Sequence, residues 1–153
     1  MARLPYASLA PEAYKRLRAL SDYLLKSGLG EDLLNLVYLR ISQINGCPYC
    51  VDLHWRYAIK AGEDPERLNG VVLWRDIPFF TDREKAALAW AEAVTRLRHQ
   101  RVSDEEFENA RHHFTEKELV DLTFAVDNMN ALNRIAIAMH QTPTTRKQTG
   151  DAR

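Results

Sequence analysis

Cys47 and Cys50 are the only cysteines in this chain of 153 residues, and they are spaced as Cys-x-x-Cys. His54 follows four residues after the second cysteine. If a helix begins with Cys47 as its N-cap and Pro48 at its first position, Cys50 and His54 share one helical face. Cys47 then lies one turn earlier on the same side. The stretch predicts a dithiol with a neighbouring base at the start of a helix.

Three physical effects would make such a dithiol reactive. Free N–H groups and the helix dipole favour a thiolate near a helix N-terminus, where Cys47 lies. His54 can take a proton or stabilise the thiolate, directly or through a water molecule. A sulfenic acid on one sulfur can condense with the other, which ends oxidation at a disulfide that another thiol must reduce. These residues therefore favour a dithiol that reduces peroxides or exchanges disulfides.

A zinc scaffold is a weaker alternative. Structural zinc sites usually have four protein ligands, and only two cysteines are present here. His54 could add a third ligand, but the other four histidines are far along the chain without paired spacing: His99, His112, His113 and His140. We therefore expect no metal. A thioredoxin fold would place the Cys-x-x-Cys after a strand, whereas the preceding residues 33–44 have a helical pattern.

The charge balance disfavours partners that need a basic surface. Lys and Arg together number 21, as do Asp and Glu, so the formal net charge is zero. Proteins that bind nucleic acid or membrane surfaces usually carry a basic excess. The sequence contains no apolar run typical of a signal peptide or a membrane span. We therefore expect a cytoplasmic protein, in which a close cysteine pair is more often catalytic or metal-binding than structural.

The remaining sequence has helix start and stop signals throughout and no strand alternation. We expect an all-α fold of six or seven helices, with one domain over residues 1–141 and a flexible tail over residues 142–153. The helix over residues 31–45 is apolar on too many sides for one narrow stripe and should be largely buried. The first three expected helices run over residues 11–27, 31–45 and 47–61, and a short fourth begins after Asp64. Three more begin at capping boxes that start with Thr81, Ser103 and Thr115, and the last of them ends near Met139.

The segment Leu39–Cys50, followed by His54 and Ala61-Gly62-Glu63, resembles the core of the AhpD-like alkylhydroperoxidases of the carboxymuconolactone decarboxylase superfamily. The likeness extends roughly over residues 35–138. It implies an all-helical protein that assembles into trimers or hexamers and reduces organic or hydrogen peroxide without haem, flavin or metal. It also implies that a thiol reductant, of lipoyl or thioredoxin type, restores the dithiol.

The resemblance also implies residue roles. Cys50 would meet the peroxide, Cys47 would resolve the sulfenic acid and face the reductant at the surface, and His54 would relay protons. The family's relay includes a glutamate twelve residues before the first cysteine, where this chain has Asn35. An amide can orient an imidazole but cannot accept its proton, and general acid–base assistance contributes typically ~10²–10⁴-fold in rate. We therefore expect weaker activation of Cys50.

Two other functions follow from these features. Asn35 could mark a catalytically weakened, oligomeric module that senses redox state or exchanges disulfides. A decarboxylase relative is a lesser alternative, because the decarboxylases of the superfamily work without a redox cysteine pair.

Two further sets of residues have open roles at this stage. The aromatic residues could line a peroxide pocket or a subunit contact, although core packing is the simpler explanation: Trp55, Tyr57, Trp74, Phe79 and Phe80. Polar residues among the apolar ones of the last helix predict buried hydrogen bonds, either within the fold or between subunits: Asn128, Asn130, Asn133 and Arg134.

Overall fold

The structure is a computed structural model that describes residues 2–143, so most of the predicted tail over residues 142–153 lies outside the described residues. The described chain has eight α-helices and two short 3₁₀ turns, and it contains no strand. The all-α prediction is confirmed, with the four-residue α1 as the helix that the sequence did not indicate. The elements are α1 (Tyr6–Leu9), α2 (Pro11–Leu24), α3 (Glu31–Asn45), α4 (Pro48–Lys60), α5 (Pro65–Gly70), η1 (Val71–Leu73), α6 (Asp82–Arg96), η2 (Arg98–Gln100), α7 (Asp104–Arg111) and α8 (Glu116–Ala138).

The predicted helix starts follow from local side-chain caps. At α6, α7 and α8 the N-cap hydroxyl accepts a hydrogen bond from the third helical N–H, and the glutamate there accepts one from the N-cap N–H. These three capping boxes pair Thr81 with Glu84, Ser103 with Glu106, and Thr115 with Glu118. Asp64 similarly accepts a hydrogen bond from the N–H of Glu66 (2.8 Å) and starts α5. Each box satisfies N–H groups that have no partner inside the helix.

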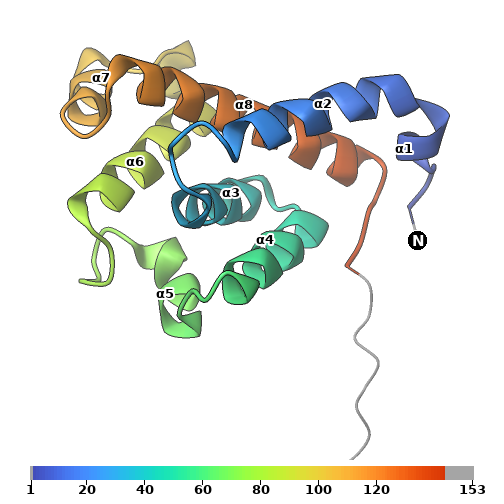
Figure 1. Cartoon of the computed structure of the whole chain (residues 1–153), viewed down its shortest axis with the longest axis horizontal. Helices are drawn as coiled ribbons and strands as arrows, with labels where there is room; N and C mark the ends of the chain where they lie inside the picture. The colour runs from blue at the N-terminus through green and yellow to red at the C-terminus, as the bar shows by residue number, and fades with distance from the viewer. Residues whose placement is uncertain (1, 144–153) are drawn as a thin grey trace, which may run out of the picture.

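Helix α3 is the element around which the others pack. Figure 1 shows it near the middle of the molecule, with α8 and α4 on opposite sides and α6 beside it. Every residue from 33 to 42 is buried, which confirms the expected burial on most sides. Because α3 is fixed on so many sides, the turn that follows it, which contains the cysteine pair, begins from a fixed position.

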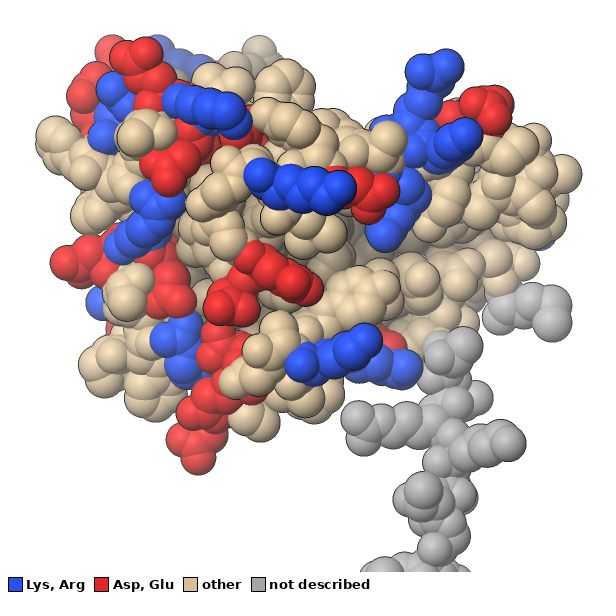
Figure 2. All heavy atoms as spheres, in the orientation of Figure 1, with Lys and Arg blue, Asp and Glu red and all other residues tan. Residues whose placement is uncertain are grey.

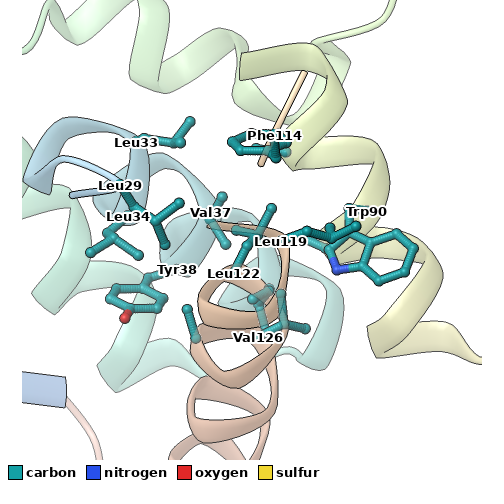
Figure 3. Packing of buried hydrophobic residues seen from close by; sticks show 14 of the residues in the cluster. Leu29, Leu33, Leu34, Val37, Tyr38, Trp90, Phe114, Leu119, Leu122 and Val126 are labelled. Atoms are coloured by element: carbon teal, nitrogen blue, oxygen red, sulfur yellow. The ribbon is translucent and has the colours of Figure 1, made fainter. Parts of the chain in front are cut away.

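Two apolar clusters form the core on either side of α3. One joins α3, α6 and α8, and Figure 3 shows Leu34, Val37 and Leu122 interdigitating there. Tyr38 lies at the edge of this cluster, with its hydroxyl directed away from the other labelled side chains. The second cluster includes Trp74 and Phe80, which are therefore core residues.

The other three predicted aromatic residues differ in their surroundings. Trp55 packs against the second core cluster. Tyr57 and Phe79 are partly exposed. Core packing therefore accounts for three of the five aromatic residues that the sequence singled out.

Glu92 of α6 is a buried carboxylate that binds several cationic side chains. It accepts hydrogen bonds from Arg40 of α3 (2.7 Å), Arg75 (2.8 Å) and the indole of Trp74 (3.1 Å). Burial alone would raise the pKa of this carboxyl, but the hydrogen bonds from Trp74, Arg75 and Arg40 outweigh it and hold the pKa at about 2. Arg96 adds a further ion pair at 3.2 Å. This cluster ties α3 to α6 and the η1 segment.

The surface has a mixed charge. On the face in Figure 2, basic and acidic side chains are interspersed rather than gathered into one large patch of a single sign. Within residues 2–143, none of the helices combines the length and apolar character needed to cross a membrane.

Candidate dithiol site

The cysteine pair lies at the junction of α3 and α4. Gly46 adopts a left-handed conformation (φ 67°) that ends α3, and Cys47 then takes an extended backbone as the N-cap of α4. The Cys47 Sγ accepts a hydrogen bond from the N–H of Cys50 (3.3 Å), and Pro48 occupies the first helical position. The predicted placement of the Cys-x-x-Cys at a helix start is confirmed.

Cys47 and Cys50 are joined by a disulfide, with their Cα atoms 5.4 Å apart. Cys50 is 4% exposed and Cys47 is fully buried, packed with Ala136 of α8. The surface position that the family resemblance implies for Cys47 is therefore wrong in this structure. The physical reason is that the N-cap side chain folds back over the first turn of α4, on the side that α8 covers.

A network of amide side chains holds this junction against α8. The Asn45 Nδ2 at the end of α3 donates hydrogen bonds to the side-chain oxygens of Asn130 (2.8 Å) and Asn133 (3.0 Å). Asn133 in turn donates to the Ser42 hydroxyl at 3.2 Å. Asn128 also donates within the chain, to Ser21 of α2 (2.9 Å).

These contacts answer the question that the sequence left open about the asparagines. Asn128, Asn130 and Asn133 are buried and make hydrogen bonds within the chain. Arg134 is exposed.

Cys50 opens onto a cavity of about 710 Å³. Asn35 of α3 and His54 of α4 also line it, so three of the four predicted site residues border the same cavity. Cys47 is not part of the lining. Residues from α2 and α8 close the other sides, including Arg18 and Met129.

His54 is a buried, neutral base in the oxidised protein. Its ring lies 5.1 Å from the Tyr38 ring and 6.0 Å from the Tyr57 ring, measured between centroids. Burial, and secondarily the positive charge of Arg18, lowers the pKa of His54 from 6.5 to about 4. Its Nδ1 has no hydrogen-bond partner among the described residues. At neutral pH the ring is therefore uncharged while the disulfide is intact.

Asn35 lies on the same cavity but is not hydrogen-bonded to His54. Its Nδ2 is buried and has no partner in the described part of the chain. Position 35 therefore carries an amide, which has N–H donors, where an ionised glutamate would have only acceptors.

Most of the cavity lining was not predicted from the sequence, and Tyr38 and Arg18 are the two of these residues closest to the chemistry of His54. Tyr38 is one turn after Asn35 on α3, so helical spacing alone could have placed both on one face. Arg18 is on α2, about thirty residues before the cysteines, and no local pattern points to it. Within residues 2–143, no three histidine, cysteine, aspartate or glutamate side chains cluster in a way that could hold a metal ion.

Comparison with known proteins assigns the family. The model of the carboxymuconolactone decarboxylase family matches residues 11–93, which is more than half of the chain. The uncharacterized protein YdfG of Bacillus subtilis strain 168 is 36% identical over 137 residues, covering 90% of this chain and 93% of that protein. The chain belongs to the carboxymuconolactone decarboxylase family. The uncharacterized protein YnjA of Escherichia coli K12 resembles this family member too, with 31% identity over 74% of this chain and 62% of that protein.

Solved structures place this family member in the AhpD-like group. A protein of unknown function from Agrobacterium tumefaciens, whose name suggests the antioxidant defence protein AhpD, superposes with a TM-score of 0.91. It is 36% identical, and the match covers 95% of this chain and all of that one. A peroxidase-related protein with an AhpD core from Ralstonia eutropha JMP134 shares the fold at 23% identity and a TM-score of 0.79, over 90% of this chain and 74% of that one.

Proposed function

We propose that this chain is a thiol-dependent alkyl hydroperoxide reductase with Cys50 as the peroxide-reacting residue. The observation that carries the proposal is the Cys47–Cys50 disulfide at the start of α4, with Cys50 and His54 on the wall of one cavity. The AhpD-like relatives agree with a redox role. The fold alone does not decide between peroxide reduction and disulfide exchange, because one fold can host several activities.

In the first step, the reduced Cys50 passes its proton to His54 and attacks the distal peroxide oxygen as a thiolate. The S–O bond forms, the O–O bond breaks, and the alkoxide takes the proton from His54 to leave as an alcohol. The Cys47 thiol then attacks the sulfenic sulfur of Cys50, which releases water and forms the disulfide. The cycle consumes one hydroperoxide and one external dithiol, and it yields an alcohol, water and an oxidised dithiol.

The burial of Cys47 favours a slender reductant. An external thiol can approach Cys50 only through the cavity, so it would form the mixed disulfide there and release Cys47. A thiol on an extended arm, of the lipoyl type, fits this route better than the broad surface of a thioredoxin-type protein.

Thiol titration tests the peroxidase proposal. With cumene hydroperoxide, the reduced wild-type protein should lose both thiols, Cys47→Ser should keep a trapped sulfenic acid, and Cys50→Ser should not react. A His112→Gln variant, altered at an exposed histidine far from the cavity, should behave as wild type. A wild-type protein that retains both thiols after peroxide would overturn the proposal.

A catalytically weakened redox sensor is the second candidate function. The observation that favours it is Asn35, which forms no hydrogen bond to His54 and cannot accept a proton. Asn35→Glu should raise the rate of disulfide formation with peroxide, whereas Asn35→Gln, which has the same size as Glu but no acid, should not. Equal rates in both variants would remove this explanation for weak activation.

We further propose a cytoplasmic homo-oligomer, a trimer or hexamer. Its support in this chain is an apolar stripe on the outer side of α8, where Val120 and Phe124 are exposed one turn apart. Leu20 and Tyr23 of α2 border the same shallow groove. Exposed apolar surfaces of this kind often mark subunit contacts.

A further inference from the structure

Three residues that line the cavity beside Cys50 each carry a buried polar atom without a partner among the described residues. These atoms are the Asn35 Nδ2, the Tyr38 hydroxyl and the His54 Nδ1. The three side chains are only 5%, 6% and 8% exposed, and all three residues line the cavity. Buried polar groups in proteins almost always have a hydrogen-bond partner, and leaving one unpaired costs free energy. Tyr38 lies one turn after Asn35 on α3 and beside His54, with ring centroids 5.1 Å apart, so the three unpartnered groups are neighbours that the oxygen atoms of one ligand would satisfy.

The rest of the wall suits a carbon skeleton. Leu53, Met129 and Leu132 supply apolar surface, and Tyr14 and Tyr49 add aromatic rings. Such a wall with a few convergent polar groups is typical of a site for a small organic molecule. A volume of about 710 Å³ leaves room for considerably more than a peroxide group.

Arg18 gives the cavity a cationic side. Its side chain is exposed on α2 and makes no ion pair or hydrogen bond with any other described residue. Burial raises the pKa values of Tyr38 and Tyr49 and lowers that of His54, and the charge of Arg18 acts to lower all three. An arginine guanidinium binds a carboxylate through two parallel hydrogen bonds.

We infer that the cavity binds an organic hydroperoxide that carries a carboxylate, with its peroxide end beside Cys50 and its carboxylate on Arg18. This inference rests on the proposed peroxidase function for the reactive end. The carboxylate site itself does not depend on turnover, because the alcohol product carries the same acid. Asn35 and Tyr38 then donate hydrogen bonds to the oxygen that becomes the alcohol.

Binding of unreactive alcohols isolates the carboxylate site. Calorimetry on the oxidised wild-type protein would compare para-carboxycumyl alcohol and hydroxydecanoate with their methyl esters. A charge-assisted hydrogen bond predicts about tenfold tighter binding of at least one acid than of its ester. Arg18→Gln should abolish this preference, and Arg16→Gln, on the same helix but outside the cavity lining, should keep it. Equal affinities for acid and ester in both pairs would overturn the inference.

The polar end has its own test. Para-isopropylbenzoate lacks only the hydroxyl of para-carboxycumyl alcohol, so it cannot bond to the three unpaired groups. Wild-type protein should prefer the alcohol several-fold, and Tyr38→Phe should reduce that preference. No preference in the wild type would contradict the assignment of this end of the cavity.

Kinetics separate the inference from the proposed function. Turnover of cumene hydroperoxide tests the peroxidase, and its para-carboxylated form should show about tenfold lower KM that depends on Arg18. Equal KM values with no effect of Arg18→Gln would overturn the inference while the peroxidase stands. Failure to consume either hydroperoxide, together with Arg18-dependent binding of the acids, would instead overturn the peroxidase and support the carboxylate site.

Discussion

At the scale of single residues, His54 shows how burial changes the role expected from spacing. Its position one turn after Cys50 places it correctly, but its pKa near 4 means that it is uncharged at neutral pH while the disulfide is intact. An uncharged imidazole cannot stabilise a thiolate by its charge, but it can accept a proton from a thiol. Asn35 does not raise the pKa of His54 as a carboxylate would, because an amide carries no negative charge.

The lowered pKa of His54 makes stability depend on pH. The unfolded chain takes up a proton near pH 6.5 and the folded chain only near pH 4. Between these values the unfolded state binds more protons, so the stabilisation is complete above about pH 6.5 and is lost as the pH falls toward about 4. A shift of about 2.5 pKa units corresponds to on the order of 3 kcal/mol.

Denaturant unfolding at pH 7.5 and pH 5 measures this effect. His54→Gln should flatten the decline in the free energy of unfolding between about pH 7.5 and pH 5, and His112→Gln should not. An unchanged decline in His54→Gln would show that another group causes it. Glu92 contributes little to this decline, because its own stabilisation is complete above its ordinary pKa of 4.5 and is lost only as the pH falls from there toward about 2.

At the scale of elements, the α3–α4 junction depends on α8. The turn from Asn45 to Cys47 has its own local signals, including the left-handed Gly46 and the N-cap cysteine. Those signals determine the backbone conformation of the turn but not its position in the fold. The hydrogen bonds from Asn45 to Asn130 and Asn133 hold it against α8, where Ala136 covers Cys47.

Removing Asn133 should therefore destabilise the junction. Asn133→Ala leaves the half-buried Asn45 amide and the buried Ser42 hydroxyl with fewer partners, which should cost about 2 kcal/mol. For a chain of this length, that corresponds to a Tm lowered by about 4–8 °C. Arg134→Ala, at the exposed neighbouring position, serves as the control in calorimetry. A Tm within about 1 °C of the control would show that the network contributes little stability.

At the scale of the whole molecule, the outer side of α8 is the surface through which we propose that copies associate. The inner side of this helix is used by the core and by the asparagine network, and Val120 and Phe124 remain exposed on the other side. The formal charge of zero offers little repulsion against association.

Light scattering on the purified protein should give the mass of a trimer or hexamer. Phe124→Lys places a charge in the exposed apolar stripe and should shift the mass toward a smaller species. A monomeric wild-type protein at micromolar concentration would contradict the proposed assembly. An unchanged mass in the variant would show that copies meet through another surface.

Local interactions explain why much of this fold could be predicted from the sequence. Capping boxes and proline positions act between neighbours in the chain, so the bounds of α3 and the start of α4 at Cys47 agree with the expectation. Helix ends without such a signal are less certain: the first predicted helix was expected to reach Ser27, but α2 ends at Leu24. The spacing of Cys50 and His54 likewise placed both on the cavity wall.

The sequence by itself determined the all-α class, the cysteine pair at a helix start and the family resemblance. Only the tertiary structure decided that Cys47 is buried, and that Arg18 and Tyr38 share the cavity with Cys50. The reason is that caps and helical spacing act within one segment of the chain. The burial of a thiol, the pKa of a histidine and the shape of a cavity depend on which helices pack together.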